Sequence, residues 1–238
     1  MAWARFTLTG ARGQALSADA VRYGPGLPPE TDLKLLGHVD GRRVLDLGCG
    51  AGAGSVALAA AGARVIAVDE DAANVAATRE AAERHGVRVE THHGKLADLA
   101  FVRAETIDAA LSSYGLAALD DIDRVFRQVH RVLREDRPFV FSLPHPAFNM
   151  LDPAEAVPRL RRRWWDAEPV SWSTAGDGAD ADRPRTFSSL FTSLARANFR
   201  IDAVAEPPAD EVGAGPSWCE ALRWVPPTLV MRARKQGL

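Results

Sequence analysis

The chain has 238 residues, of which 47% are hydrophobic and 25% are charged, and its formal net charge is −2. This composition is typical of a globular protein with a large core, and the lack of a basic excess argues against a nucleic-acid partner. Two cysteines make neither a disulfide framework nor a metal cluster, and no apolar run has the length of a membrane span or a signal peptide, so we expect a soluble cytoplasmic protein without a membrane partner.

The predicted elements alternate between strands and helices. The first forty residues are expected to form a lid, with a short helix over 15–23 and a second helix over 29–38 that two prolines open. Apolar runs and helical periodicity then predict, in chain order, strand 43–47, helix 53–61, strand 64–69, helix 71–85, strand 87–92, strand 107–112, helix 120–134, strand 139–143, helix 187–198, strand 199–205 and strand 228–234. This alternation implies a parallel sheet with right-handed crossovers.

One stretch interrupts that order. Residues 147–186 are rich in proline and tryptophan and are expected to form an insertion that caps the carboxyl edge of the sheet. The chain is therefore predicted to be a single domain, 1–238. Its parts are the lid (1–40), the core (41–146), the cap (147–186) and a segment that completes the core (187–238).

The most informative segment is a glycine-rich turn between the first predicted strand and its helix. Asp46 ends the strand, Gly48, Gly50 and Gly52 follow at alternate positions, and Asp69 ends the second strand. Glycines let the backbone turn tightly and approach a ligand, and the helix that follows offers free N–H groups. A carboxylate at the end of the second strand can accept both hydroxyl protons of a ribose. The pattern predicts a site for a nucleoside-like cofactor.

Two cofactor classes use such a turn, and glycines that serve only helix–strand packing are a third interpretation. A dinucleotide fingerprint fits Gly48–Ala53, but such a match alone is weak. Asp46 would repel a pyrophosphate and would attract the ammonium group of S-adenosylmethionine. The third glycine, two residues after the second, also favours S-adenosylmethionine.

The segment Asp46–Gly52, D-x-G-x-G-x-G, resembles the first motif of the class I S-adenosylmethionine-dependent methyltransferases. The resemblance implies a Rossmann-like, seven-stranded α/β sheet with helices on both faces and an insertion after the fifth strand. RYGP at 22–25, FRQVHRVLR at 126–134 and the segments 139–148 and 223–235 are similar to an actinobacterial-type subgroup that acts on small molecules. The resemblance names no substrate.

The carboxyl ends of parallel strands form one edge of the sheet, where ligands bind. With the resemblance, this places the cofactor on Tyr23, Asp46, Gly48, Cys49, Gly50, Gly52, Asp69, Glu70, Gly94, Lys95, Leu96, Ser112 and Tyr114. The family often has an acid where Lys95 stands, so the adenine contact falls to the N–H of Leu96 or to Asp98, and both remain open. Residues 112–114 are expected to offer a carbonyl to the methionine ammonium.

The acceptor side of the site is predicted from the cap and its border. His145, between two prolines after the fifth strand, is the candidate general base if the acceptor is a hydroxyl, and a loop hydrogen bond is its alternative role. Phe148, Trp164, Trp165 and Trp172 are candidate walls for a planar or apolar acceptor, or anchors of the cap on the core. No histidine or cysteine spacing suggests a metal.

Three functions follow from these residues. The first is methyl transfer to an oxygen or nitrogen of a small-molecule metabolite, by a monomer or homodimer. The second is an NAD-dependent oxidoreductase, against which the short chain and the lack of a Tyr-x-x-x-Lys pair both argue. The third is a cofactor-binding protein without turnover, for which Lys95 is the only support. Ser112–Gly115 stands where amino-methyltransferases have Asn/Asp-Pro-Pro-aromatic, which lowers the expectation of a nucleic-acid base or a protein glutamine as acceptor.

Overall fold

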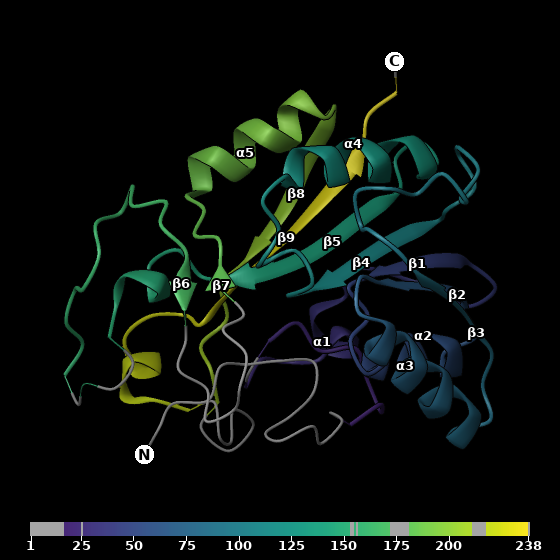
Figure 1. The fold of residues 1–238 in the computed structure, drawn as a ribbon, viewed down its shortest axis with the longest axis horizontal. Helices are drawn as coiled ribbons and strands as arrows, with labels where there is room; N and C mark the ends of the chain where they lie inside the picture. Colours follow the sequence, from purple (N-terminus) through teal and green to yellow (C-terminus); the bar gives the residue numbers. More distant parts are fainter. Residues whose placement is uncertain are drawn as a thin grey trace.

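The computed structural model describes residues 17–24, 26–152, 155, 157–171, 181–210 and 218–237. Its centre is a seven-stranded sheet in the order β3-β2-β1-β4-β5-β9-β8 (Figure 1). The strands are β1 (Arg43–Leu47), β2 (Arg64–Asp69), β3 (Val89–His93), β4 (Ala109–Ser113), β5 (Pro138–Pro144), β8 (Phe199–Ala205) and β9 (Thr228–Lys235). The predicted seven-stranded sheet is confirmed, and strands β1, β2, β4 and β5 lie where the apolar runs of the sequence predicted them.

The first five strands run parallel, and β9 runs antiparallel between β5 and β8. The four central strands β1, β2, β4 and β5 are buried along nearly their whole length, as strands covered on both faces must be. β3 and β8 form the two edges and are only partly buried. The parallel strands therefore present their carboxyl ends together, along one edge of the sheet.

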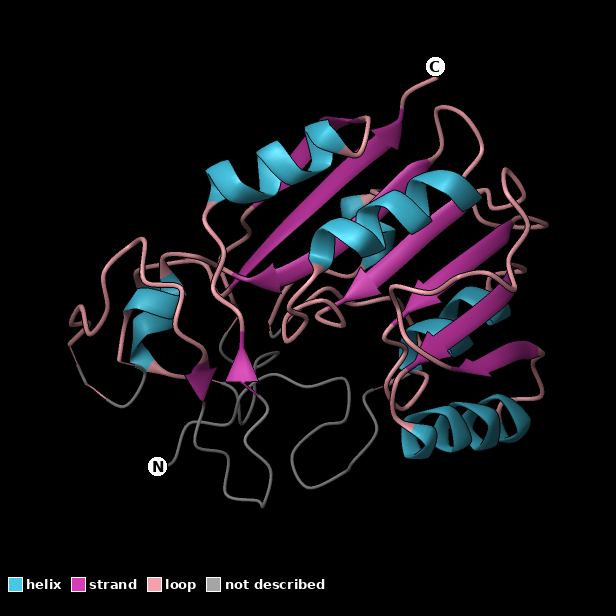
Figure 2. Ribbon diagram, turned by 45° about the horizontal axis from the view of Figure 1, so that its top comes forward, coloured by secondary structure: helices cyan, strands magenta, loops and turns pink. Residues whose placement is uncertain are grey.

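Helices cover both faces. The helices are α1 (Glu30–Leu33), α2 (Ala53–Ala60), α3 (Ala72–Arg84), α4 (Ile122–Val132) and α5 (Phe187–Arg196). Figure 2 shows α4 and α5 lying over one face, with α2 and α3 grouped at the other end of the sheet. Side-chain oxygens of Asp71, Asp121 and Thr186 accept hydrogen bonds from the first turns of α3, α4 and α5, which explains where these helices begin.

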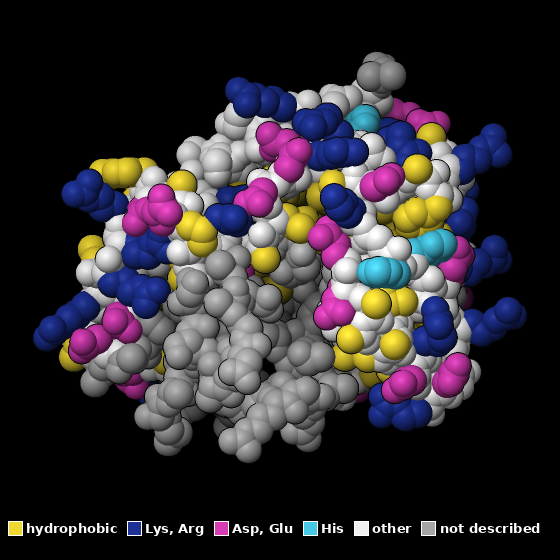
Figure 3. All heavy atoms as spheres, in the orientation of Figure 1, with side chains coloured by type: hydrophobic (Ala, Val, Ile, Leu, Met, Phe, Trp, Pro, Cys, Tyr) yellow, Lys and Arg dark blue, Asp and Glu magenta, His cyan; other side chains and the backbone are white. Residues whose placement is uncertain are grey.

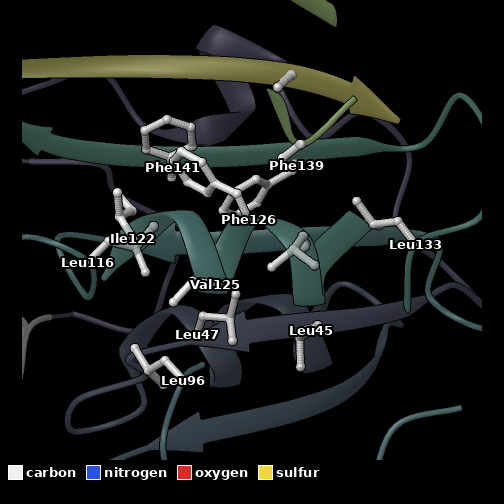
Figure 4. Close-up of a cluster of buried hydrophobic side chains, with 14 of the residues drawn as sticks. Leu45, Leu47, Leu96, Leu116, Ile122, Val125, Phe126, Leu133, Phe139 and Phe141 are labelled. Carbon is white, nitrogen blue, oxygen red and sulfur yellow. The ribbon is translucent and has the colours of Figure 1, made fainter. Parts of the chain in front are cut away.

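Alternation along the strands divides the core in two. In β1, Leu45 and Leu47 point into the cluster beneath α4 and α5, whereas Val44 points into the cluster beneath α1 and α2. In the first cluster Phe126 of α4 lies against Phe139 and Phe141 of β5, with ring centroids 5.9 and 5.4 Å apart (Figure 4). The two clusters hold the sheet rigid from both sides, so the residues at its carboxyl edge are carried on a packed scaffold.

The largest differences from the predicted elements lie in the lid and the cap. Residues 17–23 are not helical, and the helix expected over 29–38 is a single turn, α1, because Lys34 adopts a left-handed backbone with φ of 52°. The cap contains a two-stranded ladder that sequence reasoning missed, β6 (Val170–Ser171) and β7 (Ala181–Asp182). Residues 1–16 of the expected lid lie outside the described residues.

Candidate functional site

The glycine turn joins β1 to α2 through three left-handed residues. Gly48, Gly50 and Gly52 have φ angles of 71°, 55° and 87°. A Cβ on Gly48 would lie 2.5 Å from the Cα of Gly115, in the loop after β4. Only glycine permits that approach, which brings the ends of β1 and β4 together. The turn is therefore shaped by its own sequence, before any ligand is considered.

Asp69 holds this turn from the end of β2. Its Oδ2 accepts the N–H of Gly50 at 2.9 Å, and its Oδ1 accepts the N–H of Asp71 at 2.9 Å and the amide of Asn74 at 3.1 Å. A carboxylate offers about four lone-pair directions. Three are used here, so the carboxylate both fixes the turn and keeps capacity for a further donor.

The inner side of the turn is closed by a buried chain of hydrogen bonds. The Thr78 hydroxyl of α3 donates to the carbonyl of Gly50 at 2.9 Å, and the Cys49 sulfur lies 3.3 Å from the same hydroxyl oxygen. Burial raises the pKa of the Cys49 thiol well above its ordinary value. Cys49 is thus a small, buried residue whose thiol is not activated as a nucleophile.

A small cavity, which we call the turn cavity, opens between the turn and the lid. It is lined by Ser17, Ala20, Arg22, Asp46, Cys49, Ala53, Gly54, Leu111 and Ser113. Asp46 is 3% exposed, and the Ser55 hydroxyl donates to its Oδ2 at 2.6 Å. Burial raises the pKa of Asp46 to about 6, and the charge of Asp69 adds to the shift. No cation pairs with Asp46 among the described residues.

The charges around the turn cavity fit one end of S-adenosylmethionine. Asp46, a buried carboxylate with no cation beside it among the described residues, lines the cavity together with Arg22. Arg22 forms a half-exposed ion pair of 3.4 Å with Asp19. The amino acid group of S-adenosylmethionine carries an ammonium that can pair with Asp46 and a carboxylate that can pair with Arg22. A pyrophosphate would place negative charge against Asp46, so the same wall fits a dinucleotide poorly.

The adenosine side of the site lies across Asp69, between β2 and the loop after β3. The N–H of Leu96, one of the two candidate adenine contacts, donates to Glu70 Oε1 at 3.0 Å, and His93 Nε2 lies 3.1 Å from the Glu70 carbonyl. Lys95 is exposed, and Asp98 is exposed and accepts a local hydrogen bond from Ala100. The Glu70 carboxylate therefore already accepts the hydrogen bond from the Leu96 N–H, one of the two groups predicted to contact adenine.

Other predicted cofactor residues have structural partners. Tyr23 is fully buried, and its hydroxyl donates to Glu30 at 2.7 Å, so it is the neighbouring Arg22 that reaches the turn cavity. The Ser112 hydroxyl donates to the carbonyl of Leu47 at 2.7 Å. The Tyr114 hydroxyl lies 2.6 Å from that of Thr228, and a Cβ on Gly94 would meet nothing within 4 Å.

His145 lies where β5 meets the cap, and both of its ring nitrogens have partners. Nδ1 accepts the N–H of Ala147 at 3.1 Å, and Nε2 lies 2.8 Å from Glu206 Oε1. Because Nδ1 accepts, the proton of a neutral ring is on Nε2 and points at Glu206. The ring is buried, whereas the Glu206 side chain is half exposed. Glu206, 61 residues away along the chain, has no signal in the sequence that would connect it to His145.

The cap places the predicted aromatic residues differently from one another. Phe148 is buried in a cluster with Leu151 and Leu222, which is the anchoring role. Trp164 is 39% exposed and stacks on Phe187, with ring centroids 6.4 Å apart, while Trp165 is 75% exposed. Trp172 lies outside the described residues.

A cleft of about 270 Å³, which we call the insertion cleft, opens next to these tryptophans. Its walls include Pro146, Asn149, Arg162, Arg163, Trp164 and Arg185. Figure 3 shows acidic and basic side chains interspersed on the face it draws, with no broad basic patch. Within the described part of the chain, no three His, Cys, Asp or Glu side chains gather as metal ligands, and no helix is long and apolar enough to cross a membrane.

Comparison with known proteins agrees with this geometry. Residues 44–136 match a family model described as a methyltransferase domain. An S-adenosylmethionine-dependent methyltransferase from Mesorhizobium loti superposes with a TM-score of 0.72 and 27% identity, covering 85% of this chain and 95% of that one. A probable S-adenosylmethionine-dependent methyltransferase from Mycolicibacterium smegmatis is 35% identical over 44% of this chain and 39% of its own. An uncharacterized protein from Haemophilus influenzae is 24% identical over 93% of this chain and 92% of its own.

The sheet order, the glycine turn and the acid after β2 define an α/β protein of the Rossmann-like class. The methyltransferase domain matched over residues 44–136 and the similar proteins support the assignment of this chain as a class I S-adenosylmethionine-dependent methyltransferase. It is an enzyme, and S-adenosylmethionine is its cofactor.

Proposed function

We propose that this methyltransferase acts on an oxygen or nitrogen of a small-molecule metabolite bound between the carboxyl end of β5 and the cap. The observation that carries the proposal is the insertion cleft, because it is concave, partly aromatic and begins at Pro146, directly after His145. Its volume of about 270 Å³ is near the lower end of small-ligand pockets. The resemblance to actinobacterial-type small-molecule methyltransferases supports the same acceptor class.

The proposal assigns the cofactor to the residues around the glycine turn. Asp46 holds the ammonium and Arg22 the carboxylate of its amino acid group, since both side chains line the turn cavity. Asp69 accepts a ribose hydroxyl with its remaining lone pair. The N–H of Leu96 is released from Glu70 to meet adenine, and the carbonyls of residues 112–114 lie at the methionine end.

Bound S-adenosylmethionine supplies a methyl carbon already activated by a positively charged sulfur. The residues of the chain therefore have to hold the acceptor in line and exclude water, and positioning of this kind can supply most of the rate. A new bond forms from the acceptor oxygen or nitrogen to the methyl carbon as the carbon–sulfur bond breaks, and the sulfur keeps the electron pair. A hydroxyl acceptor also has to lose its proton.

We assign that proton to His145. Because Nε2 carries the proton of the neutral ring and Nδ1 accepts from Ala147, base action requires that the Ala147 N–H release Nδ1 when the acceptor binds. The Nε2–Glu206 hydrogen bond orients the ring and would stabilise it once it is protonated. For a neutral amine acceptor no base is needed, and His145 then only orients the corner between β5 and the cap.

Labelled methyl transfer tests the proposal. The full chain would be incubated with tritium-labelled S-adenosylmethionine and separate pools of small hydroxylated and aminated metabolites, of protein and of RNA. The expected result is label in a small-molecule pool and background counts in the two polymer pools. Label that enters only protein or RNA contradicts the assignment of the acceptor class, whatever the affinity for the cofactor.

A further inference from the structure

The insertion cleft contains a buried polar side chain whose oxygen has no hydrogen-bond partner in the described part of the chain. Asn149 is 5% exposed, and its Oδ1 has no hydrogen-bond partner. No hydrogen bond of the other amide atom is found within the described residues either. A buried amide left unpaired costs about 1–3 kcal/mol. Because this amide lies in the wall of an open cleft, a ligand in the cleft is the missing partner.

Two guanidinium groups in the same walls, those of Arg163 and Arg185, form no direct ion pair among the described residues, although Asp120, Asp123 and Asp182 lie within electrostatic range of Arg185. Arg185 donates only to the backbone carbonyls of Arg183 and Leu119, and burial lowers the pKa of its guanidinium. Arg163 has no ion pair among the described residues. Arg162, in contrast, is paired with Asp166 at 3.4 Å. Among the residues that line the cleft, the charges of Arg162 and Asp166 cancel, and those of Arg163 and Arg185 remain.

A flat apolar surface accompanies the charges. Trp164 lines the cleft and stacks on Phe187 with an interplanar angle of 26°. Phe187 in turn lies edge-on to His145, with ring centroids 5.4 Å apart. A chain of aromatic contacts thus runs from the cleft to the residue at the end of β5. A planar ring fits beside an indole, and guanidinium groups bind carboxylates through paired hydrogen bonds.

We propose that the insertion cleft binds the carboxylate of a planar, single-ring acceptor, with Arg185 and Arg163 on the carboxylate, Asn149 on a polar ring substituent and Trp164 against the ring. This inference rests on the proposed function, since it names the substrate class of that site. The inference extends the proposed function by predicting that the enzyme selects acceptors with a negative charge. A neutral acceptor of the same shape would leave two guanidinium groups and an amide desolvated without partners.

Matched probes test the charge. The dissociation constants of 4-hydroxybenzoate and 4-hydroxybenzamide would be measured on the full chain by tryptophan fluorescence, with S-adenosylhomocysteine present. The carboxylate is expected to bind at least tenfold more tightly than the amide. Arg185→Met and, separately, Arg163→Met should each reduce that preference at least threefold, and Asn149→Leu should weaken both probes.

Control variants separate charge from folding and from the cofactor. Arg159→Met, in the same basic run but outside the cleft walls, should keep the preference. The Arg163 side chain is exposed and forms no hydrogen bond with the described residues, so its variant remains informative if Arg185→Met fails to fold. S-adenosylhomocysteine affinity, measured by calorimetry, should stay within twofold in every variant.

The outcomes are distinguishable. Equal affinity for the two probes, or a preference that survives both arginine variants, overturns the anion site and leaves the proposed function standing. Selective binding of the carboxylate with label transferred only to polymers overturns the proposed function and, with it, the assignment of this ligand as the acceptor.

Discussion

Asp46 is the residue at which stability and cofactor binding oppose each other. Burial raises its pKa to about 6 from an ordinary value of 3.8, which corresponds to about 3 kcal/mol against the ionised form. The folded chain therefore holds more protons than the unfolded chain between these two values. This group's contribution to stability falls as pH rises from about 4 to 6 and stays low above 6.

We expect Asp46→Asn to be more stable than the parent protein at pH 7.5, by about 1–3 kcal/mol, and to lose most of this advantage at pH 4.5. Urea unfolding at the two pH values measures the difference. Cofactor affinity of the parent should rise through pH 6 as the carboxylate ionises, and should fall at least tenfold in the variant at pH 7.5. Equal affinity of the two proteins would remove Asp46 from the cofactor site.

Gly50 tests the turn itself. With φ of 55°, valine at this position is strained, and we expect its branched side chain to block the approach of the cofactor to the turn. Gly50→Val should abolish cofactor binding in calorimetry. Gly86→Val is the matched control, because Gly86 has φ of 66° at the end of α3 and open space around it. The control should suffer similar backbone strain and bind normally; loss of binding in both variants would indicate unfolding rather than a blocked site.

His145→Ala tests the proton transfer. If the acceptor is a hydroxyl, kcat should fall at least tenfold while cofactor affinity changes less than twofold, because the ring lies at the end of β5 and not in the turn cavity. Glu206→Gln keeps a hydrogen-bond acceptor for Nε2 and should have a smaller effect. A parental rate at saturating acceptor would leave His145 with the orienting role alone.

At the scale of elements, α4 shows how a helix is bound to the sheet. Its apolar residues recur with helical spacing, and Phe126 is fully buried against two phenylalanines of β5. Phe126→Ala should reduce the free energy of unfolding by about 3–5 kcal/mol. Arg127→Ala, on the exposed side of the same helix, should change it by less than about 0.5 kcal/mol. Chemical denaturation measures both, and equal effects would contradict the packing described here.

Elements with a strong local pattern were predicted closely. Strands β1, β2 and β8 have the predicted bounds, and α3, α4 and α5 differ from theirs by at most two residues at either end. Helical periodicity and capping residues depend only on a few neighbouring residues, which is why the sequence predicts them well. The failures lie where the pattern is weak. The helix expected over 29–38 stops at Leu33, and the β6–β7 ladder, whose strands are only two residues long, was not foreseen.

At the scale of the whole molecule, ligand binding should be visible in stability. The proposed cofactor site is built from residues of β1, β2, β4 and the lid, so we expect a ligand there to bind only the folded chain. S-adenosylhomocysteine at 100 times its dissociation constant should add about 2.7 kcal/mol and raise Tm by about 5–10 °C. Differential scanning fluorimetry measures this shift. The Gly50→Val protein should show none, whereas NAD at the same concentration should not shift the parent.

The sequence by itself determined the sheet, the glycine turn and the cofactor class. Apolar runs, helical periodicity and glycine spacing are local properties, so they can be recognised without knowledge of the tertiary contacts. Only the tertiary structure decided which side chains meet. It buries Tyr23 on Glu30 and leaves Arg22 facing Asp46, it sets Glu70 on the N–H of Leu96, and it pairs His145 with Glu206. Such contacts join segments far apart along the chain. They depend on how strands and loops cross in space, which no local pattern records.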